Sequence, residues 1–277
     1  MAGGKVFCIG NGESRKDFDL HKLKEHGKIY GCNGLYRDFT PDVLLAMDYN
    51  ICHEIYRSGY AFENPVYLKS WDKNPHTLHP KLFEPETIAK FIGQDIEDIS
   101  EYVDEWAWKG EKKRYFVCWA NNKDLMKKMR EERKDWKEDD FKLYLSEDQE
   151  GYLITWLKKK DKVMGLGKYA NEKTNAGILI AMMAADVEKK IYLIGYDYYS
   201  KLSTVNNVYK GTNGYVGEKA AAIDPQNWIH HTKRLLNRYE NHEFIHVGQP
   251  IDDLEERKNW NTITYNELDE RITSRNL

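Results

Sequence analysis

Near its amino end the chain reads Lys5-Val6-Phe7-Cys8-Ile9-Gly10-Asn11-Gly12-Glu13-Ser14. The continuous apolar run Lys5–Ile9 predicts a strand that is buried on both faces, as strands of parallel sheets are. Two glycines follow at once, and glycine lets the backbone turn tightly and approach a ligand closely. A buried strand that ends in such a turn is typical of the first unit of an α/β sheet.

Further strand-like runs recur along the chain, between polar or helical stretches. Periodicity predicts an apolar helix at Gly177–Glu188, a charged, solvated helix at Asn122–Lys137 and a docked helix with a frayed end within Asp252–Leu277. This alternation predicts an α/β fold, a Rossmann-like and mostly parallel sheet with helices on both faces. We expect one domain over residues 1–277, in which residues 64–113 are an inserted lid or subdomain or, equally, an irregular surface excursion. The other expected strands are Lys28–Cys32, Val43–Met47, Arg114–Trp119, Phe141–Leu145, Lys190–Ile194 and Glu243–Val247.

The composition is that of an ordinary soluble chain, with 277 residues of which 41% are hydrophobic and 31% charged. The formal net charge of −3 excludes a protein that binds duplex nucleic acid mainly by its overall charge. Any nucleic-acid contact would therefore need a local patch. Aromatic residues reach 13%, with 19 Tyr and 8 Trp, which favours a site for flat or sugar-like ligands.

The four cysteines, Cys8, Cys32, Cys52 and Cys118, are widely spaced and include no C-x-x-C pair. This spacing argues against a zinc site or a disulfide framework and favours reduced, buried thiols. The sequence shows no signal-peptide pattern, and no apolar run approaches the roughly 20 residues that span a bilayer. We therefore expect a cytoplasmic protein without membrane contact.

The turn Gly10–Ser14 is the sharpest local feature. Ser14 could cap the next helix, whose exposed N–H groups would offer a site for a phosphate. Position 15 is Arg, so the third glycine of the dinucleotide fingerprint G-x-G-x-x-G is missing. A strand-to-helix turn that binds no ligand remains the alternative.

Polar residues also follow the next two strands. Asn33 can donate and accept hydrogen bonds where ligands of open α/β sheets sit, at the carboxyl ends of strands, although an Asn-Gly turn would look the same. Asp48 could bind a ribose hydroxyl, a sugar hydroxyl or a metal, or it could cap the following helix.

Three later segments carry polar residues at the ends of apolar elements. Lys173–Gly177 opens the apolar helix and offers N–H donors beside a lysine cation, and Ile191–Tyr199 ends a strand in Gly, Asp and three Tyr. Asn227–Thr232 places a His pair beside Trp228 before an amphipathic helix. A neutral imidazole is the natural group to deprotonate a hydroxyl nucleophile, and a structural His pair is equally open.

Several metal and phosphate motifs are missing. The doublet His230-His231 lacks the i, i+4 spacing of a helical zinc pair, and no H-E-x-x-H or Walker A loop occurs. A P-loop kinase is therefore not expected. The letters D-x-D occur at Asp17–Asp19, beyond the first turn rather than at a strand end.

Together these segments resemble glycosyltransferase family 42, the bacterial lipooligosaccharide sialyltransferases, and the related family of hydroxymethylpterin pyrophosphokinases. The family's Gly-Asn-Gly-Pro-Ser is similar to Gly10–Ser14, and its Cys-Asn-Gln is similar to Cys32–Gly34. Its Arg-Ile-Thr-Ser-Gly, Ile-Tyr-Leu-Ser-Gly-Ile-Asp-Phe-Tyr and Tyr-Ile-Gly-His-Ser are similar to Lys173–Gly177, Ile191–Tyr199 and Trp228–Thr232. The likeness covers the first 50 residues and about Lys173 to Val247, and the middle of the chain is unmatched.

This resemblance implies a nucleotide-sugar-dependent glycosyltransferase whose donor lies across the carboxyl edge of the sheet. It places the general base three residues after an aromatic residue, which selects His231 rather than His230. Tyr199 and Tyr209 would hydrogen-bond the leaving phosphate in place of a metal, so we expect no bound divalent metal and no other cofactor. The expected donor-binding residues are Gly10, Asn11, Gly12, Ser14, Asn33, Asp48, Lys173, Asn175, Ala176 and Gly195.

The chain also departs from the family. Asp48 stands in place of a nucleotide-contacting Asn, Lys173 in place of an Arg and Trp228 in place of a Tyr, so the sugar or nucleotide could differ. The opening G-N-G-E-S-R-K also looks like proteins of tailed phages, some of which glycosylate hydroxymethylated pyrimidines in their own DNA. That likeness implies such a base as the acceptor, in the cytoplasm of the host cell, with a pentose such as arabinose as one candidate sugar.

The basic runs Lys127–Lys137 and Lys158–Lys162 would be the landing surface for DNA, or they are plain solvated helix faces. Three other functions stay open: transfer to a glycan as in the sialyltransferases, a pterin-type diphosphokinase that needs a divalent metal, and a non-enzymatic nucleotide-binding or phage-assembly module. The oligomeric state is open, a homo-oligomer included.

Overall fold

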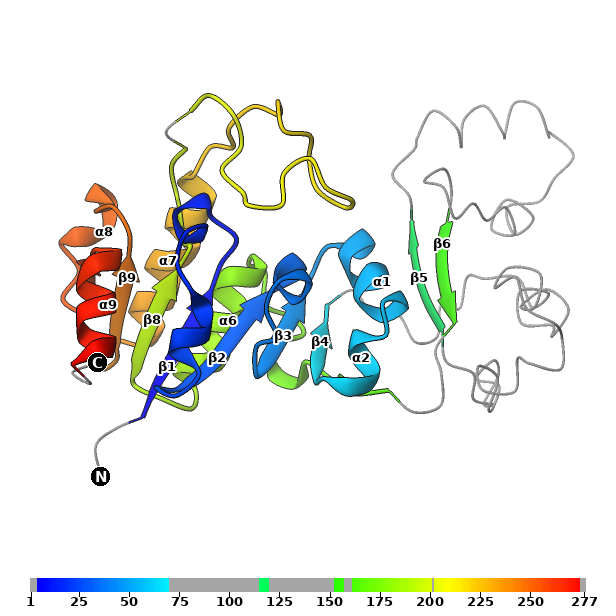
Figure 1. The fold of residues 1–277 in the computed structure, drawn as a ribbon, viewed down its shortest axis with the longest axis horizontal. Coiled ribbons are helices and arrows are strands. Elements are labelled where there is room, and N and C mark those ends of the chain that lie inside the picture. Colours follow the sequence, from blue (N-terminus) through cyan, green and yellow to red (C-terminus); the bar gives the residue numbers. More distant parts are fainter. Residues whose placement is uncertain (1–3, 70–114, 120–151, 157–160, 201, 275–277) are drawn as a thin grey trace, which may run out of the picture. The chain divides into compact units, whose positions relative to one another are not determined.

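The computed structural model describes residues 4–69, 115–119, 152–156, 161–200 and 202–274 (Figure 1). The chain divides into two compact units, one of residues 1–47, 64–69 and 164–277 and the other of residues 48–63 and 70–163. The segment 64–113, expected as a lid or surface excursion, begins in the first unit, and from residue 70 it lies outside the described residues.

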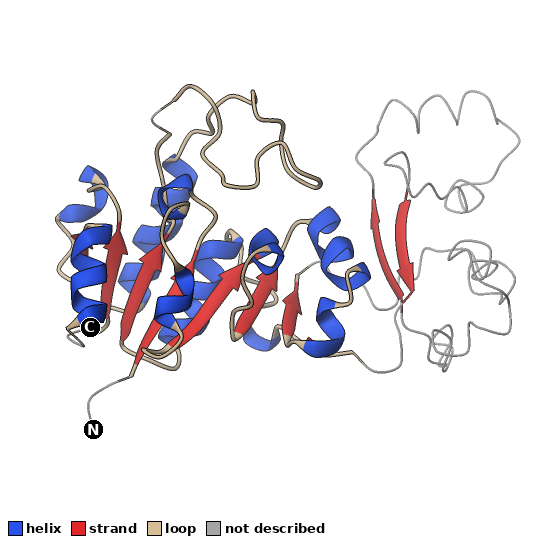
Figure 2. Cartoon of the chain, viewed as in Figure 1, coloured by secondary structure: helices blue, strands red, loops and turns tan. Residues whose placement is uncertain are grey.

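An eight-stranded sheet carries the fold, with strand order β10-β9-β8-β1-β2-β3-β4-β7 (Figure 2). The pairings from β10 across to β4 are all parallel. The predicted α/β class is therefore confirmed. The strands are β1 (Lys5–Ile9), β2 (Lys28–Cys32), β3 (Val43–Ala46), β4 (Val66–Leu68), β7 (Val163–Met164), β8 (Lys190–Ile194), β9 (Glu243–Val247) and β10 (Trp260–Ile263).

Helices cover both faces of this sheet. The apolar helix α6 (Ala176–Ala185) and the amphipathic helix α7 (Gln226–Arg238) pack on the face that carries Val6 and Cys8 of β1. Helix α9 (Tyr265–Thr273) lies on the opposite face (Figure 1). Because both faces are covered, all four residues Val6–Ile9 are at most 1% exposed, which explains the continuous apolar run. The remaining described helices are α1 (Tyr49–Arg57), α2 (Tyr60–Glu63) and α8 (Asp252–Glu255).

The strand order reverses at β1. The chain leaves β1 through β2, β3 and β4 on one side and returns on the other side as β8, β9 and β10. The connections that leave β1 and β8 therefore lead to opposite sides of the sheet. Open α/β sheets bind ligands in the crevice that such a reversal creates.

The sequence located most of these elements. The strands β1, β2, β8 and β9 have the predicted bounds, and β3 ends one residue early. The predicted run Arg114–Trp119 forms β5 (Tyr115–Trp119), which pairs antiparallel with β6 (Tyr152–Trp156) in a separate two-stranded sheet. The predicted helix Asn122–Lys137 and strand Phe141–Leu145 lie outside the described residues.

The carboxyl-terminal stretch was predicted only in part. A helix was expected within Asp252–Leu277, and α9 is that helix, but β10 precedes it and extends the sheet. The strand was missed because it has four residues and its middle pair, Asn261 and Thr262, is polar. Among the described helices, none is long and apolar enough to cross a bilayer.

Two buried tyrosines allow a matched test of the core. The Tyr192 ring packs against Phe7, with ring centroids 5.2 Å apart, and its buried hydroxyl has no hydrogen-bond partner among the described residues. The Tyr198 hydroxyl lies 2.8 Å from Thr232 Oγ1 and is also buried. A buried polar group without a partner is unfavourable, whereas a paired one stabilises the fold by about 1 kcal/mol.

We therefore expect Tyr192→Phe to leave the free energy of unfolding unchanged or to raise it. Tyr198→Phe should lower it by about 1 kcal/mol, because the buried hydrogen bond between Tyr198 and Thr232 is lost. Urea unfolding followed by circular dichroism measures both variants. A loss in Tyr192→Phe as large as that in Tyr198→Phe would contradict this account of the core.

Candidate functional site

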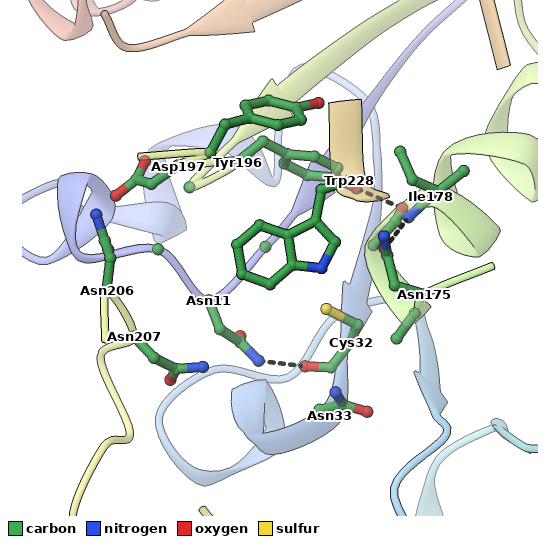
Figure 3. A pocket seen from close by; sticks show the side chains of 16 residues that line it. Asn11, Cys32, Asn33, Asn175, Ile178, Tyr196, Asp197, Asn206, Asn207 and Trp228 are labelled. Carbon is green, nitrogen blue, oxygen red and sulfur yellow. Dashed lines mark hydrogen bonds between the residues drawn. The ribbon is translucent and has the colours of Figure 1, made fainter. Parts of the chain in front are cut away.

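A cavity of about 190 Å³ lies in the first unit, at the carboxyl ends of β1, β2 and β8 (Figure 3). Pockets that enclose whole drug-sized ligands typically measure roughly 300–1,000 Å³, so this one fits a part of a ligand, such as a base or a sugar. It is lined by Gly10, Asn11, Gly12, Cys32, Asn33, Asn175, Ala176, Gly177, Ile178, Gly195, Tyr196, Asp197, Tyr198, Asn206, Asn207 and Trp228.

The lining is polar but almost uncharged. Asparagine amides come from five positions, and the indole of Trp228 stands among them (Figure 3). Asp197 is the one acidic residue of the lining, and no lysine or arginine is among the described lining residues. Such a surface suits a neutral ring or sugar with many hydrogen-bonding groups, and it offers an aromatic plane for stacking.

The glycine-rich turn after β1 borders the cavity, but its N–H groups already have acceptors. The N–H of Gly12 donates to Gly195 O at 2.9 Å, that of Glu13 to Asn206 Oδ1 at 2.7 Å and that of Ser14 to Asp197 Oδ2 at 2.8 Å. These are the donors that were expected to hold a phosphate. A phosphate there would have to displace protein acceptors and would lie next to the Asp197 carboxylate. The expected phosphate site at the N–H groups of Gly10–Ser14 is therefore not supported by this geometry.

Ser14 does not cap a helix. The residue before the 3-10 turn Glu13–Arg15 is Gly12, which makes no side-chain cap. The Ser14 hydroxyl instead donates to Asp197 Oδ1 at 2.5 Å. The sequence made a capping role plausible. In the structure the Ser14 hydroxyl is used in the hydrogen bond to Asp197, which follows β8.

The two glycines of the turn serve the protein's own packing. A Cβ atom on Gly10 would overlap the backbone oxygen of Gly195, and one on Gly12 would overlap the Asp197 carboxyl. Gly195 itself has a φ of +69°, in the left-handed region. The glycines therefore permit close approach, as expected, but the approaching chain is the segment after β8.

The helix α6 points its amino end at the cavity. Its N-cap is Asn175, whose Oδ1 accepts a hydrogen bond from the Ile178 N–H at 2.9 Å. The N–H groups of Ala176 and Gly177 precede the first intrahelical bond, so the helix supplies no acceptor for them. This arrangement favours an anionic or electron-rich ligand group. Asn175 and Ala176 thus stand where the sequence predicted, whereas Lys173 is exposed and does not line the cavity.

Asn11 lines the cavity, and hydrogen bonds hold its amide in one orientation. Its Nδ2 donates to Cys32 O at 3.4 Å and to the Tyr215 hydroxyl at 3.3 Å, and its Oδ1 is buried without a partner among the described residues. Because Cys32 O can only accept, the amide cannot be turned the other way. Asn33 also lines the cavity, with φ at 49°, and its Oδ1 accepts from the Met47 N–H at 3.1 Å.

His231 was expected to be the general base at the entrance of a helix. The structure places it inside α7, one turn after Trp228, so the predicted entrance is in fact the first two turns of the helix. Trp228 lines the cavity and His231 does not. Burial and the nearby Arg234 and His230 lower the pKa of His231, which keeps its imidazole neutral at pH 7.

The two tyrosines expected at the leaving phosphate also lie outside the lining. Tyr199 is 48% exposed, and burial together with Asp253 and Asp252 raises its pKa. The Tyr209 hydroxyl accepts from Arg15 Nη2 at 2.8 Å and donates to Asp38, so it belongs to an ionic network with the buried Arg15 and the partly exposed Asp38. Its pKa is raised by burial, despite Arg15. Neither hydroxyl faces the cavity in this structure.

Asp48 belongs to the second compact unit. The sequence allowed Asp48 either to bind a ligand or metal or to cap the following helix. It does occupy the N-cap position of α1, but its side chain makes no capping hydrogen bond. Burial raises its pKa. Among the described residues, no group of three or more His, Cys, Asp or Glu side chains is placed to hold a metal ion. The expectation that activity needs no metal stays a prediction.

Sequence reasoning missed the two lining asparagines Asn206 and Asn207, which lie in the long loop between β8 and α7. No periodicity or motif marks that loop. It is tied to the rest of the site by Tyr215, whose hydroxyl accepts from the Gly34 N–H at 2.8 Å, and by Arg37, which donates to Thr212 Oγ1 at 2.6 Å. Tertiary contacts of this kind, together with the hydrogen bond from the Glu13 N–H to Asn206, bring the asparagines to the cavity.

Comparison with known proteins returns no significant match to a family model, to a curated protein or to a solved structure.

The close approach at Gly10 can be tested by substitution. We expect Gly10→Ala to lower the free energy of unfolding by about 1–3 kcal/mol, because the added Cβ meets a backbone oxygen that cannot rotate away. Gly217→Ala is the matched control, since its Cβ would enter open space. It should change stability by less than about 0.5 kcal/mol. Equal stability of the two variants in guanidinium unfolding would show that the approach is looser than described.

Proposed function

We propose that this protein is a nucleotide-sugar-dependent glycosyltransferase whose donor occupies the cavity at the carboxyl ends of β1, β2 and β8. The observation that carries the proposal is the position of this cavity at the reversal of strand order, with an open helix amino end, an aromatic plane and five asparagine amides around it. The resemblance of five segments to glycosyltransferase family 42 supports the same reading.

The phosphate of the donor would lie at the amino end of α6. The N–H groups of Ala176 and Gly177, for which the helix supplies no acceptor, are donors of the kind that hold a phosphate. The turn after β1 is less suitable, because its donors are engaged and Asp197 adds negative charge. Figure 3 shows Asn175 and Asp197 on opposite sides of Trp228, so an anion at α6 would be kept away from the carboxylate.

The neutral part of the donor would lie among the asparagines and Trp228. The cavity is too small for a whole nucleotide sugar, so the rest of the donor would extend out of it. In the transfer, the acceptor oxygen bonds to the anomeric carbon and the phosphate leaves with the electron pair of the broken bond. Fixed N–H donors that face this developing charge stabilise the transition state.

The lining favours this function over a diphosphokinase. A metal-bound triphosphate is usually held by carboxylates and cationic side chains, whereas Asp197 is the one carboxylate among the described lining residues and no lysine or arginine is found there. As the acceptor we propose a hydroxymethylated pyrimidine in phage DNA, with arabinose as one candidate sugar. This rests on the resemblance to phage proteins. Of the two basic runs that would receive the DNA, 127–137 lies outside the described residues, and so does 158–162 except for its last two residues.

Donor binding is tested by calorimetry with uridine and cytidine mono- and diphosphate sugars. We expect Trp228→Ala to weaken binding by about 5- to 150-fold, because base–aromatic stacking contributes about 1–3 kcal/mol. His230→Ala is the matched control, since it is exposed on the same helix and does not line the cavity. Absence of binding by the wild-type chain across these ligands would refute the proposed function.

The acceptor is tested by mass spectrometry of hydroxymethylated DNA incubated with the enzyme and the donor that binds. We expect a mass increase of one sugar per modified base. The rate should fall steeply as salt is added, because contacts to DNA phosphates release counterions. Transfer to an oligosaccharide but not to DNA would replace this acceptor by a glycan.

A further inference from the structure

Asp197 follows β8 and is the one acidic residue among the described residues that line the cavity (Figure 3). Its Oδ2 accepts the Ser14 N–H at 2.8 Å and its Oδ1 accepts the Ser14 hydroxyl at 2.5 Å. An ionised carboxylate has about four lone-pair positions, of which Ser14 uses two. Asp197 is therefore held in a fixed orientation and keeps the capacity to accept a further proton.

The hydrogen bonds behind Asp197 have a single possible direction. A carboxylate only accepts, so Ser14 Oγ spends its one proton on Asp197. Tyr265 of α9 has its hydroxyl 2.9 Å from Ser14 Oγ and must then be the donor in that contact. The Tyr265 hydroxyl accepts in turn from the Gly195 N–H at 3.2 Å. A directed chain thus runs from the Gly195 N–H through Tyr265 and Ser14 to the carboxylate.

We propose that Asp197 is the general base of the transfer, with Ser14 and Tyr265 as positioning residues. This role rests on the proposed function. As the acceptor oxygen bonds to the anomeric carbon, its proton passes to a carboxylate oxygen of Asp197. The bond from that carbon to the phosphate oxygen breaks, and its electron pair leaves with the nucleotide.

The geometry favours Asp197 over His231. A base must come within about 2.6–3.2 Å of the proton's heavy atom, or reach it through one water. Asp197 lines the cavity, whereas His231 does not. The chain of hydrogen bonds ends at Asp197, and hydrogen bonds linked in this way hold one another in place. Asp197, a lining residue with its carboxylate fixed by Ser14, is thus closer to a ligand in the cavity than His231 is.

The test compares Asp197→Ala, Asp197→Asn and His231→Ala with the wild-type enzyme on the same donor and acceptor. We expect both Asp197 variants to lower kcat by about 10²–10⁴-fold, the usual contribution of a positioned base, with the donor Kd changed by less than threefold. His231→Ala should lower kcat by less than tenfold. Asp253→Asn is the matched control, because Asp253 is exposed and pairs with Lys233 at 3.1 Å, away from the lining.

Chemical rescue separates a catalytic role from a structural one. Added formate should raise the kcat of Asp197→Ala at least tenfold over its value without formate. A free carboxylate can enter the space that the side chain left and take the proton. It should restore nothing in His231→Ala. Thermal unfolding and donor calorimetry establish that each variant is folded and binds.

Folded, donor-binding Asp197 variants with wild-type kcat would overturn the role of Asp197 and leave the proposed function standing. A large loss in Asp197→Ala that formate does not restore would also overturn it. Failure of the wild-type chain to transfer any sugar would instead refute the proposed function, and this role with it.

Discussion

The close approach of the backbones that follow β1 and β8 is the constraint on which the rest of the site depends. Gly10 N–H donates to Ile194 O at 2.8 Å and Gly12 N–H to Gly195 O at 2.9 Å, so the two segments continue to pair after the strands end. The approach leaves no room for a Cβ on Gly10. Because the strand order reverses here, the same contact forms one wall of the cavity.

A buried arginine fixes the opposite side of that turn. Arg15 is 4% exposed, and a charge so buried is tolerated only when it is paired and hydrogen-bonded. Its Nε donates to Gly10 O at 2.9 Å, its Nη2 to the Tyr209 hydroxyl at 2.8 Å, and its Nη1 lies 3.5 Å from Asp38 Oδ2. Arg15 thus occupies the position of the third glycine in the dinucleotide fingerprint. Through Tyr209 it anchors the loop that carries Asn206 and Asn207.

The electrostatics of the cavity follow from these two contacts. The turn after β1 donates its N–H groups to Asn206 and Asp197, whereas α6 directs the positive end of its helix dipole toward the cavity. The carboxylate of Asp197 and the amino end of α6 therefore present opposite polarity to one ligand. Such a gradient can orient a molecule that has a neutral ring, an anionic group and a hydroxyl to be deprotonated.

The sequence by itself determined the parallel sheet and the location of most of its strands, because burial on both faces imposes continuous apolar runs such as Lys5–Ile9. It also determined that polar residues gather at the ends of β1, β2 and β8, since these ends share one edge. Only the tertiary structure decided which of them face the cavity. Asn206 lines the cavity although it lies in a loop without periodicity. Tyr209 is instead hydrogen-bonded to Arg15 and Asp38, and Ser14 to Asp197. Hydrogen bonds between residues that are far apart in the chain produce no local sequence pattern. They decide whether a polar side chain can bind a ligand or is engaged in stabilising the fold.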